Sequence, residues 1–338
     1  MAVKSVKQNS RVTEPQERQE DLTNENSLRP KRLDEYIGQT GLKKHLKILL
    51  ESARIRKEPL DHILFYGPPW LGKTTISNVI ANEMQTKIKS TSWPAIEKQA
   101  DLISVLTSLE FWDILFIDEI HRLKPQIEEI LYSAMEDFNI DIIIWSWNGA
   151  TSIKMDIPKF CLIWATTKLS KLSNPLRDRF ANVIKLDFYD ENELSTIIER
   201  SLRILDCEIK NRAVYQIIAK KSRWTPRIAN RFVKIIRDYN VVWHSIENEL
   251  DIEKIFEWFW IDETGLDILD KKILESLLFS FAGKPVWLNT LASIIWEDEA
   301  TIEDVIEPYL LKIWFIERTP KWRKITLEWE RYLRKVKK

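Results

Sequence analysis

The segment with the most specific chemistry is a loop that matches G-x-x-x-x-G-K-T from Gly67 to Thr74. An apolar run precedes it and a helical pattern follows it, which is the context that a phosphate-binding loop requires. Backbone N–H groups of such a loop, with the helix start, bind phosphate oxygens. Lys73 would neutralise the β- and γ-phosphates, and the Thr74 hydroxyl would ligate Mg²⁺. The predicted contacts to ATP or ADP are Gly67, Trp70, Gly72, Lys73, Thr74 and Thr75.

Two further polar segments follow apolar runs. Asp118 and Glu119 come directly after residues 114–117, and carboxylates at a strand's carboxyl end lie where an open α/β sheet binds ligands. Asp118 suits coordination of Mg²⁺ through water, and Glu119 suits polarisation of the attacking water. An isolated Asp-Glu pair is usually a solvated loop, but together with the phosphate loop it indicates catalysis. Thr166 and Thr167 follow a third apolar run, although threonine at strand ends is common.

The elements that must position these residues alternate between strand and helix. Residues 62–66, 114–117 and 160–163 read as buried strands, and residues 41–57 and 73–84 as helices. This alternation predicts an α/β fold with a parallel sheet covered by helices on both faces. Residues 142–144 and 151–153 predict a protruding hairpin.

The second half of the chain has a helical pattern. Residues 191–205, 212–221, 226–239 and 252–259 predict a small helical bundle. Helices at 267–281, 287–295 and 302–311, followed by apolar strands near 313–317 and 324–326, predict a winged helix. We therefore expect a polar, disordered arm (1–27), a P-loop domain (28–189), a helical lid (190–261) and a winged-helix domain (262–338).

Composition limits the class of protein. Of the 338 residues, 44% are apolar and 30% charged, and no stretch approaches twenty apolar residues, so we expect a soluble cytoplasmic protein without a membrane span. Cys161 and Cys207 lie in apolar patterns and favour core thiols over a disulfide or a metal site. The net charge is zero, yet residues 312–338 carry ten Lys or Arg against three Glu, a net of +7. This tail is either a solvated surface or a phosphate-binding one.

Several strings together resemble the RuvB family of AAA+ motors, which drive branch migration of Holliday junctions. They are Leu28-Arg29-Pro30, Ile117 to Arg122, Leu176 to Phe180, Trp224 to Arg231, Glu307 to Leu310 and Arg318-Thr319-Pro320. The resemblance covers nearly the whole chain beyond the arm. It implies DNA recombination and repair under the SOS response, and a homohexamer acting on duplex DNA.

The resemblance also implies roles for single residues. Thr167 would sense the γ-phosphate, Arg179 would reach the neighbouring subunit's nucleotide, and Arg227 would be a second sensor. Arg177 would be the lesser candidate for the finger. Leu28, Arg29, Tyr36 and Ile37 would line the adenine pocket. Glu136, Asp137, Phe138 and Tyr189 would also border nucleotide. A guanidinium suits the finger role because phosphoryl transfer builds charge on oxygens that it can hold bidentately.

Partners are likewise implied by the resemblance. The hairpin at residues 141–153 would contact a RuvA-type junction-binding protein, and a RuvC-type resolvase is a further partner. Arg318 and Arg323 of the winged helix would contact the DNA backbone, with an affinity that falls with salt.

The chain departs from this family at glycine. It has 7 glycines and 15 tryptophans, whereas glycine alone usually makes up about 7% of residues, or roughly 24 here. The family carries glycine where this chain has Trp70, 93, 112, 145, 147, 164, 224, 287, 296, 314 and 322. Trp243 and Trp260 fit the same set, while Trp258 and Trp329 read as genuine. Our hypothesis is that UGA codons for glycine have been read as tryptophan.

Two other functions stay open at this point. A clamp-loader or initiator-type AAA+ protein shares the phosphate loop and the finger but lacks the terminal winged helix. A nucleotide-regulated DNA-binding switch is the alternative if position 70 carries an indole, because glycine there allows φ > 0 and close approach to phosphate.

Overall fold

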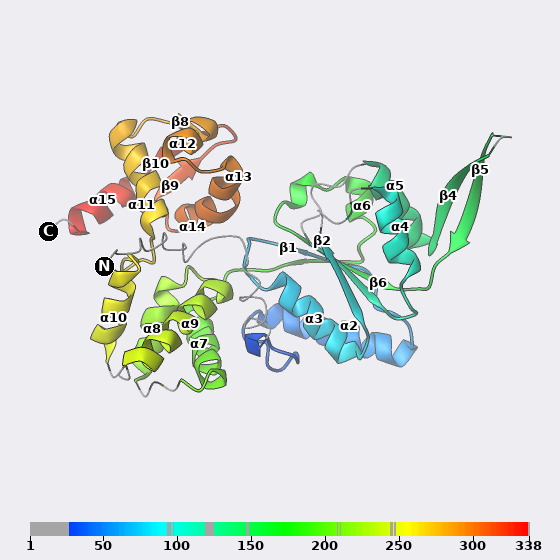
Figure 1. The fold of residues 1–338 in the computed structure, drawn as a ribbon, viewed down its shortest axis with the longest axis horizontal. Helices are drawn as coiled ribbons and strands as arrows, with labels where there is room; N and C mark the ends of the chain where they lie inside the picture. The colour runs from blue at the N-terminus through cyan, green and yellow to red at the C-terminus, as the bar shows by residue number, and fades with distance from the viewer. Residues whose placement is uncertain are drawn as a thin grey trace, which may run out of the picture. The chain divides into compact units, whose positions relative to one another are not determined.

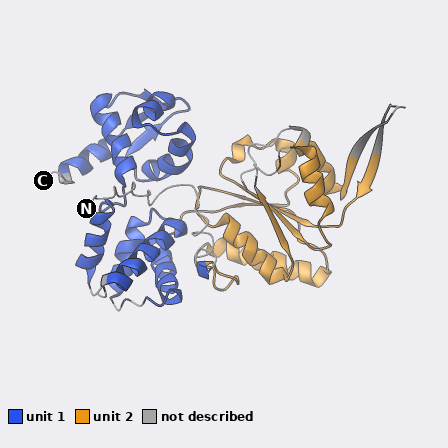
Figure 2. Ribbon diagram, in the orientation of Figure 1, with its two compact units in different colours: residues 1–28, 189–338 blue, residues 29–188 orange. Residues whose placement is uncertain are grey.

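The computed structural model describes residues 27–336 apart from 93–95, 97, 119–124, 147–148, 208, 210, 244–245 and 247. It contains two compact units, residues 29–188 and residues 189–338 with Leu28, drawn in two colours in Figure 2. The predicted arm lies outside the described residues.

The first unit is built on a five-stranded parallel sheet in the order β2-β3-β6-β1-β7 (Figure 1). The strands are β1 (Ile63–Tyr66), β2 (Ile88–Ser92), β3 (Ile114–Asp118), β6 (Cys161–Thr166) and β7 (Asn182–Lys185). The central strands β1, β3 and β6 are continuous apolar runs because both faces of the sheet are covered. These three strands confirm the sequence prediction, whereas β2 and β7 were not predicted.

Helices cover both faces of this sheet (Figure 1). On one face lie α2 (Thr40–Arg56) and α3 (Lys73–Met84), and on the other lie α4 (Gln99–Thr107) and α5 (Pro125–Glu136). Leucines 102, 106 and 131 of α4 and α5 pack with the sheet residues Leu64 and Leu162 in one core. A 3-10 turn (Leu169–Lys171) and the short helix α6 (Asn174–Arg177) lead from β6 to β7.

The predicted hairpin is present and longer than expected. Strands β4 (Asn139–Ser146) and β5 (Gly149–Asp156) form an antiparallel pair that extends from the first unit (Figure 1). Pairing begins at Asn139 with Asp156 and continues to Ser146 with Gly149.

In the second unit, residues 189–258 form a helical bundle. Its helices are α7 (Glu191–Ile204), α8 (Arg212–Lys221), α9 (Pro226–Trp243) and α10 (Glu249–Trp258). Asp190 and Asn248 cap α7 and α10 by accepting hydrogen bonds from backbone N–H groups three residues later. These caps, with a strong apolar stripe on each helix, explain why all four helices were predictable.

Residues 262–336 form the predicted winged helix. It contains α11 (Ile268–Glu275), a π-helical turn (Ser276–Ser280), α12 (Leu288–Ile295), α13 (Glu299–Thr301), a second π-helical turn (Ile302–Ile306) and α14 (Glu307–Lys312). A small antiparallel sheet has the order β8-β10-β9, from Val286–Trp287, Trp322–Ile325 and Ile316–Arg318. Helix α15 (Leu327–Val336) follows.

Two smaller predictions concern membrane and thiols. Among the described residues, no helix combines the length and the apolar character that crossing a membrane requires. Cys161 and Cys207 are buried and free, as the apolar patterns predicted.

Candidate functional site

The carboxyl edge of the parallel sheet brings the predicted catalytic segments together. Tyr66 at the end of β1 pairs with Thr166 at the end of β6, and Asp118 at the end of β3 pairs with Ala165. The phosphate loop follows β1, whose neighbour β6 leads to Thr167, and β6 in turn lies between β1 and β3, which carries Asp118. This is the edge at which open α/β sheets bind ligands.

Two glycines give the phosphate loop its shape. Gly67 has φ +145°, and a Cβ there would lie 2.5 Å from the carbonyl oxygen of Leu186. Gly72 has φ +90° and is the N-cap of α3. Both positions exclude a side chain, for steric reasons at Gly67 and for conformational reasons at Gly72. The loop thus ends at the N-terminus of a twelve-residue helix, where N–H groups favour an anion.

Lys73 lies within the loop. Its side chain is nearly buried, and its ammonium donates hydrogen bonds to the carbonyls of Gly67 and Pro68, both at 2.7 Å. The ammonium is therefore held where the loop would wrap a phosphate group. Thr74 and Thr75 follow in the first turn of α3 and are partly buried.

Trp70 adopts φ +67°, the left-handed conformation that favours glycine. It is not alone. Of the thirteen non-glycine residues with positive φ in the described part of the chain, six are tryptophan: Trp70, Trp112, Trp224, Trp260, Trp296 and Trp314. Five of them belong to the set that the family resemblance assigns to glycine. Trp260, which was added from the sequence as a further member, is the sixth. The backbone therefore supports the glycine hypothesis independently of the resemblance.

The remaining tryptophans divide differently. Trp164 in β6 is fully buried against Phe180, so the core accommodates the bulk that the sequence analysis considered ill placed. Its indole N–H is nevertheless buried without a hydrogen-bond partner among the described residues. Trp93 and Trp147 lie outside the described residues.

The residues predicted for the adenine pocket, for the second sensor and for the border of the nucleotide lie in both units. Tyr36 is buried, and its hydroxyl lies 3.5 Å from the carbonyl of Leu71 in the phosphate loop. Arg29 and Ile37, from the same unit, are partly buried. Leu28, Tyr189 and Arg227 belong to the second unit. There the N–H of Tyr189 donates to the carbonyl of Trp224, three residues before Arg227.

Asp118 and Thr167 occupy the predicted positions at the strand ends, and Glu119 lies outside the described residues. Thr166 ends β6, is fully buried, and its hydroxyl accepts a hydrogen bond from the N–H of Lys168. That bond fixes the turn on which the partly buried Thr167 stands.

Arg179 lies away from this site. It comes just before the amino end of β7, and its guanidinium donates to the carbonyl of Pro175 at 2.8 Å and to Glu136 at 3.0 Å. It also stacks on Tyr132, 4.5 Å from the ring centre. Helix α5 starts after the β3 segment and returns to the opposite sheet edge, so Glu136 and Arg179 meet at the amino edge.

Phe138 is at the same amino edge. It packs on His62, which precedes β1, and on Phe160, which precedes β6. The expectation that Glu136, Asp137 and Phe138 border nucleotide therefore cannot refer to this chain's own phosphate loop, which leaves the carboxyl edge.

Arg323 and Arg318 flank the turn between β9 and β10. Arg323 is only 2% exposed, and its guanidinium donates to Glu307, itself 1% exposed. Arg318 pairs with the same carboxylate at 3.1 Å but leaves 45% of its side chain exposed. The expectation of a DNA contact therefore rests on Arg318, because the buried donors of Arg323 already face carboxylates.

Two residues of these sites were missed in the sequence. Tyr132 supports Arg179, and its hydroxyl bonds Glu128 and Ser173, each at 3.0 Å. Glu307 joins the two arginines. The spacing of four residues from 128 to 132 to 136 was the available signal for the first, since it places those side chains on one helix face.

Family comparisons match the chain in three consecutive parts. The models are the Holliday junction DNA helicase RuvB P-loop domain at residues 28–186, the RuvB AAA lid domain at 189–255 and the RuvB C-terminal winged helix domain at 263–334.

Solved structures agree with these matches. The structure of the Thermotoga maritima RuvB Holliday junction branch migration motor is 45% identical, over 91% of this chain and 98% of that one, with a TM-score of 0.82. Two point mutants of Thermotoga maritima RuvB are 47% and 46% identical, with the same coverage and TM-scores of 0.83. Together with the phosphate loop, the lid and the winged helix, these matches show that the chain belongs to the RuvB family of Holliday junction DNA helicases.

Proposed function

We propose that this chain hydrolyses ATP at the carboxyl edge of its sheet and uses the energy to drive branch migration of Holliday junctions. The observation that carries this proposal is the strand register, which gathers the phosphate loop, Asp118 and Thr167 at one edge. The proposed domains are residues 28–189, 190–261 and 262–338.

The proposed chemistry is attack of water on the γ-phosphate. Glu119 orients that water, Lys73 stabilises negative charge on the β- and γ-phosphates, and Thr167 reads the γ-phosphate. A hydroxyl and a carboxylate at one edge, from Thr74 and Asp118, are a donor set that suits Mg²⁺. Bound there, Mg²⁺ would supply charge neutralisation on the phosphates.

Arg179 is proposed to complete the site of a neighbouring subunit. Its position at the amino edge, opposite the phosphate loop, supports a role in trans because it faces away from its own loop. Stacking on Tyr132 and pairing with Glu136 hold the side chain in place. This role requires a ring, and we propose the homohexamer that the family resemblance implies.

A mixing experiment tests this assignment. Lys73→Ala removes a subunit's own site but keeps its finger, whereas Arg179→Ala keeps the phosphate loop but removes the finger. Each variant alone should lose hydrolysis by about 10³-fold or more, and an equimolar mixture should recover part of it, because complete sites form between unlike subunits. Both variants carry Trp70→Gly. A mixture as inactive as its components would contradict a finger acting in trans.

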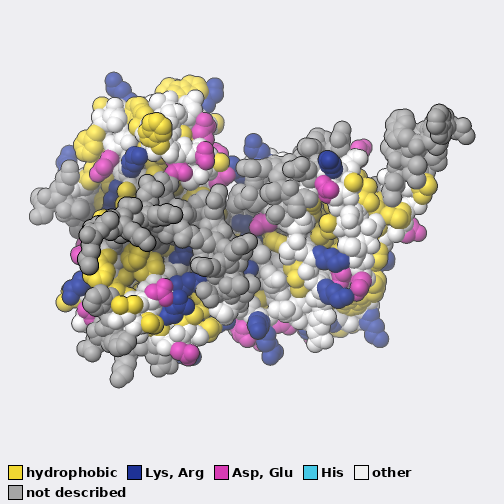
Figure 3. All heavy atoms as spheres, in the orientation of Figure 1, with side chains coloured by type: hydrophobic (Ala, Val, Ile, Leu, Met, Phe, Trp, Pro, Cys, Tyr) yellow, Lys and Arg dark blue, Asp and Glu magenta, His cyan; other side chains and the backbone are white. Residues whose placement is uncertain are grey.

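The DNA contact is proposed at the turn between β9 and β10. Basic and acidic side chains are interspersed over both units on the face drawn in Figure 3, in keeping with a net charge of zero. DNA binding therefore depends on a few placed cations, of which the half-exposed Arg318 is the foremost. Hairpin β4–β5 is the proposed surface for a RuvA-type protein. A RuvC-type resolvase and a cytoplasmic location complete the proposal.

The working polypeptide is proposed to carry glycine where Trp70 is written. A tryptophan with φ +67° is strained, and its indole would occupy space in a loop that has to wrap phosphate. If residue 70 is tryptophan, the same observation favours the second candidate, a nucleotide-regulated DNA-binding switch with weak or absent turnover.

A further inference from the structure

One lysine and one arginine at the end of α8 are buried where the lid meets the winged helix. Lys221 and Arg223 each leave only 3% of their side chains exposed. Charged side chains are seldom buried unless they are paired. Both are paired here: Lys221 with Glu253 of the lid and with the connector of residues 261–267, and Arg223 with the connector and with α11.

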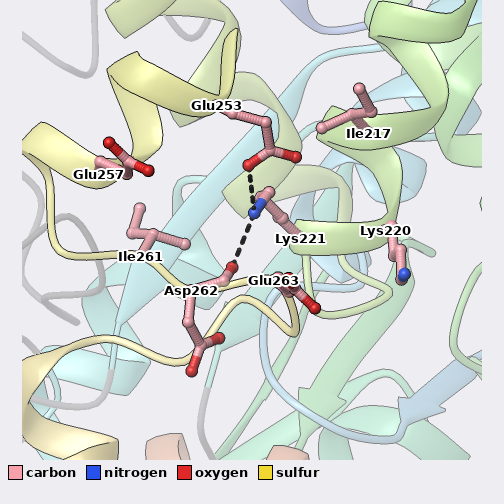
Figure 4. Close-up of a pocket in the computed structure, with 8 residues that line it drawn as sticks. All are labelled: Ile217, Lys220, Lys221, Glu253, Glu257, Ile261, Asp262 and Glu263. Carbon is pink, nitrogen blue, oxygen red and sulfur yellow. Dashed lines mark hydrogen bonds and ion pairs between the residues drawn. The ribbon is translucent and has the colours of Figure 1, made fainter. Parts of the chain in front are cut away.

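Lys221 fastens the connector to the lid. Its ammonium donates to the carbonyl of Asp262 at 2.9 Å and pairs with Glu253 of α10 at 3.0 Å (Figure 4). It also lies 5.1 Å from the centre of the Phe256 ring. Figure 4 shows Lys221 pointing between α10 and the connector, at the wall of an open pocket of about 500 Å³.

Arg223 reaches past the connector into the winged helix. Its Nε donates to the carbonyl of Gly265 at 2.9 Å, and its terminal nitrogen contacts Asp270 at 2.5 Å and Asp267 at 3.3 Å. Asp270 is fully buried, and burial raises the pKa of its carboxyl while Arg223 opposes that rise. Asp267 caps α11, so Arg223 is tied to the first turn of this helix.

The connector has no room to move at Gly265. This residue has φ +80°, and a Cβ would lie 2.4 Å from the carbonyl oxygen of Lys221. Asp262 closes the other side, because its carboxylate accepts from Thr264, from the N–H of Leu266 and from Tyr332 of α15. The connector is therefore packed against α8 on one side and tied to the winged helix on the other.

The same end of α8 leads directly to the proposed nucleotide sensor. Arg227 is four residues after Arg223, in the first turn of α9. The intervening turn is closed by the N–H of Thr225, which donates to the carbonyl of Ser222. A shift of Arg227 would therefore displace Arg223 with little slack between them.

We propose that Lys221 and Arg223 are positioning residues that lock the lid to the winged helix, so that movement at Arg227 is delivered to the DNA-binding domain. A buried ion pair specifies one arrangement of its partners, because any other arrangement leaves charge buried without a partner. In a DNA motor, that property transmits displacement where a flexible linker would absorb it. The inference rests on the motor function proposed above.

Two variants remove the lock without leaving one buried charge alone. Arg223→Met/Asp270→Asn removes both partners of the central pair, and Lys221→Met removes the tie to the connector. The control is Lys254→Met, which breaks an ion pair between an exposed lysine and Asp251 on the lid helix α10. All are made in the full chain carrying Trp70→Gly.

The first measurement is junction movement per ATP hydrolysed, with a four-way junction and the RuvA-type partner. We expect the lock variants to lower this ratio by about tenfold while hydrolysis changes less than about threefold, and the control to keep the parent ratio. Loss of fold would lower both quantities together. A parallel fall, or an unchanged ratio, would overturn the proposal.

The second measurement needs no nucleotide. Spin labels on Arg203→Cys in α7 and Asn289→Cys in α12 report the distance between lid and winged helix in the full chain. The parent should give one narrow distribution and the lock variants a broad one. A narrow distance distribution in the variants would refute the lock, whatever the junction assay shows. A parent protein that cannot move a junction would instead count against the motor function.

Discussion

Tryptophan occurs in two contrasting settings in this chain, the phosphate loop and the core of the winged helix. Trp70 in the loop has φ +67° and stands between Gly67 and Gly72, where the backbone itself must approach phosphate. Trp329 in α15 is helical and 2% exposed, with ring centres 5.2 Å from Phe315 and 5.4 Å from Tyr332. The backbone conformation disfavours a tryptophan at position 70, whereas packing against neighbouring rings stabilises Trp329.

The contrast separates two kinds of tryptophan. A left-handed conformation costs an L-residue with a Cβ roughly 1–2 kcal/mol, and glycine avoids this cost. Among the described residues, six tryptophans adopt that conformation, and Trp329 does not. The backbone thus favours glycine at six tryptophan positions without any alignment, whereas packing favours an aromatic ring at Trp329.

The largest effect is expected where tryptophan belongs. Trp329→Ala should destabilise the winged helix by about 3–5 kcal/mol, because it removes a buried ring that Phe315 and Tyr332 pack against. Hydrogen exchange of the α11 and α15 amides measures this, since the two-unit chain need not unfold in one step. A loss below about 1 kcal/mol would mean that the indole is not part of the core.

Local pattern was enough to predict the phosphate site. The apolar run before Gly67, the helix after it and Asp118 after a second run are all near in sequence to what they form. Strands β2 and β7 were missed because they lack such a local apolar pattern. Ile88 is the single apolar residue in β2, and the side chains of β7, at the sheet edge, alternate between partly buried and exposed. Their place is decided by pairing with β3 and β1.

Side-chain surroundings could not be predicted in this way. Arg323 was expected to contact the DNA backbone from the family resemblance, but it is buried and pairs with Glu307, which lies sixteen residues earlier. Glu136 and Phe138 were expected near nucleotide from the family resemblance. A resemblance implies a residue's role, but it does not give the place of that residue in the fold. Only the return of α5 to the amino edge shows that they lie with Arg179.

The second-largest effect is expected on ATP affinity, at Trp70 in the phosphate loop. Trp70→Gly should raise ATP affinity by at least about tenfold, or about 1.4 kcal/mol, because it relieves the loop and clears the space beside the phosphates. Titration with a fluorescent ATP analogue measures the affinity, and Trp329→Phe serves as a control that should leave it unchanged.

The gene gives an independent check on the same position. Codons UGA at residues 70, 112 and 224 would agree with glycine in the working polypeptide. Codons UGG there, together with unchanged ATP affinity in Trp70→Gly, would show that the loop tolerates an indole. The switch would then be the better function.

The smallest effect is expected on the stability of α10, where two neighbouring tryptophans can be compared. Trp258 is the last residue of α10, and Trp260, two residues later, has φ +52° and follows the helix cap. Both are exposed, at 58% and 54%, and Trp258 also contacts the ring of Tyr239, with 5.7 Å between the ring centres. The N–H groups of Trp260 and Ile261 bond back to Glu257 and Phe256, an arrangement in which glycine is favoured at position 260.

We therefore expect opposite signs from one substitution at two neighbouring sites. Trp260→Gly should stabilise α10 by about 1 kcal/mol, whereas Trp258→Gly should destabilise it by about 0.5–1 kcal/mol through added backbone entropy in the helix. Hydrogen exchange of the α10 amides compares the two directly. Equal destabilisation by both would remove the backbone argument for glycine. The two residues are exposed to a similar degree and lie on either side of the end of α10, so opposite signs would follow from their backbone conformation.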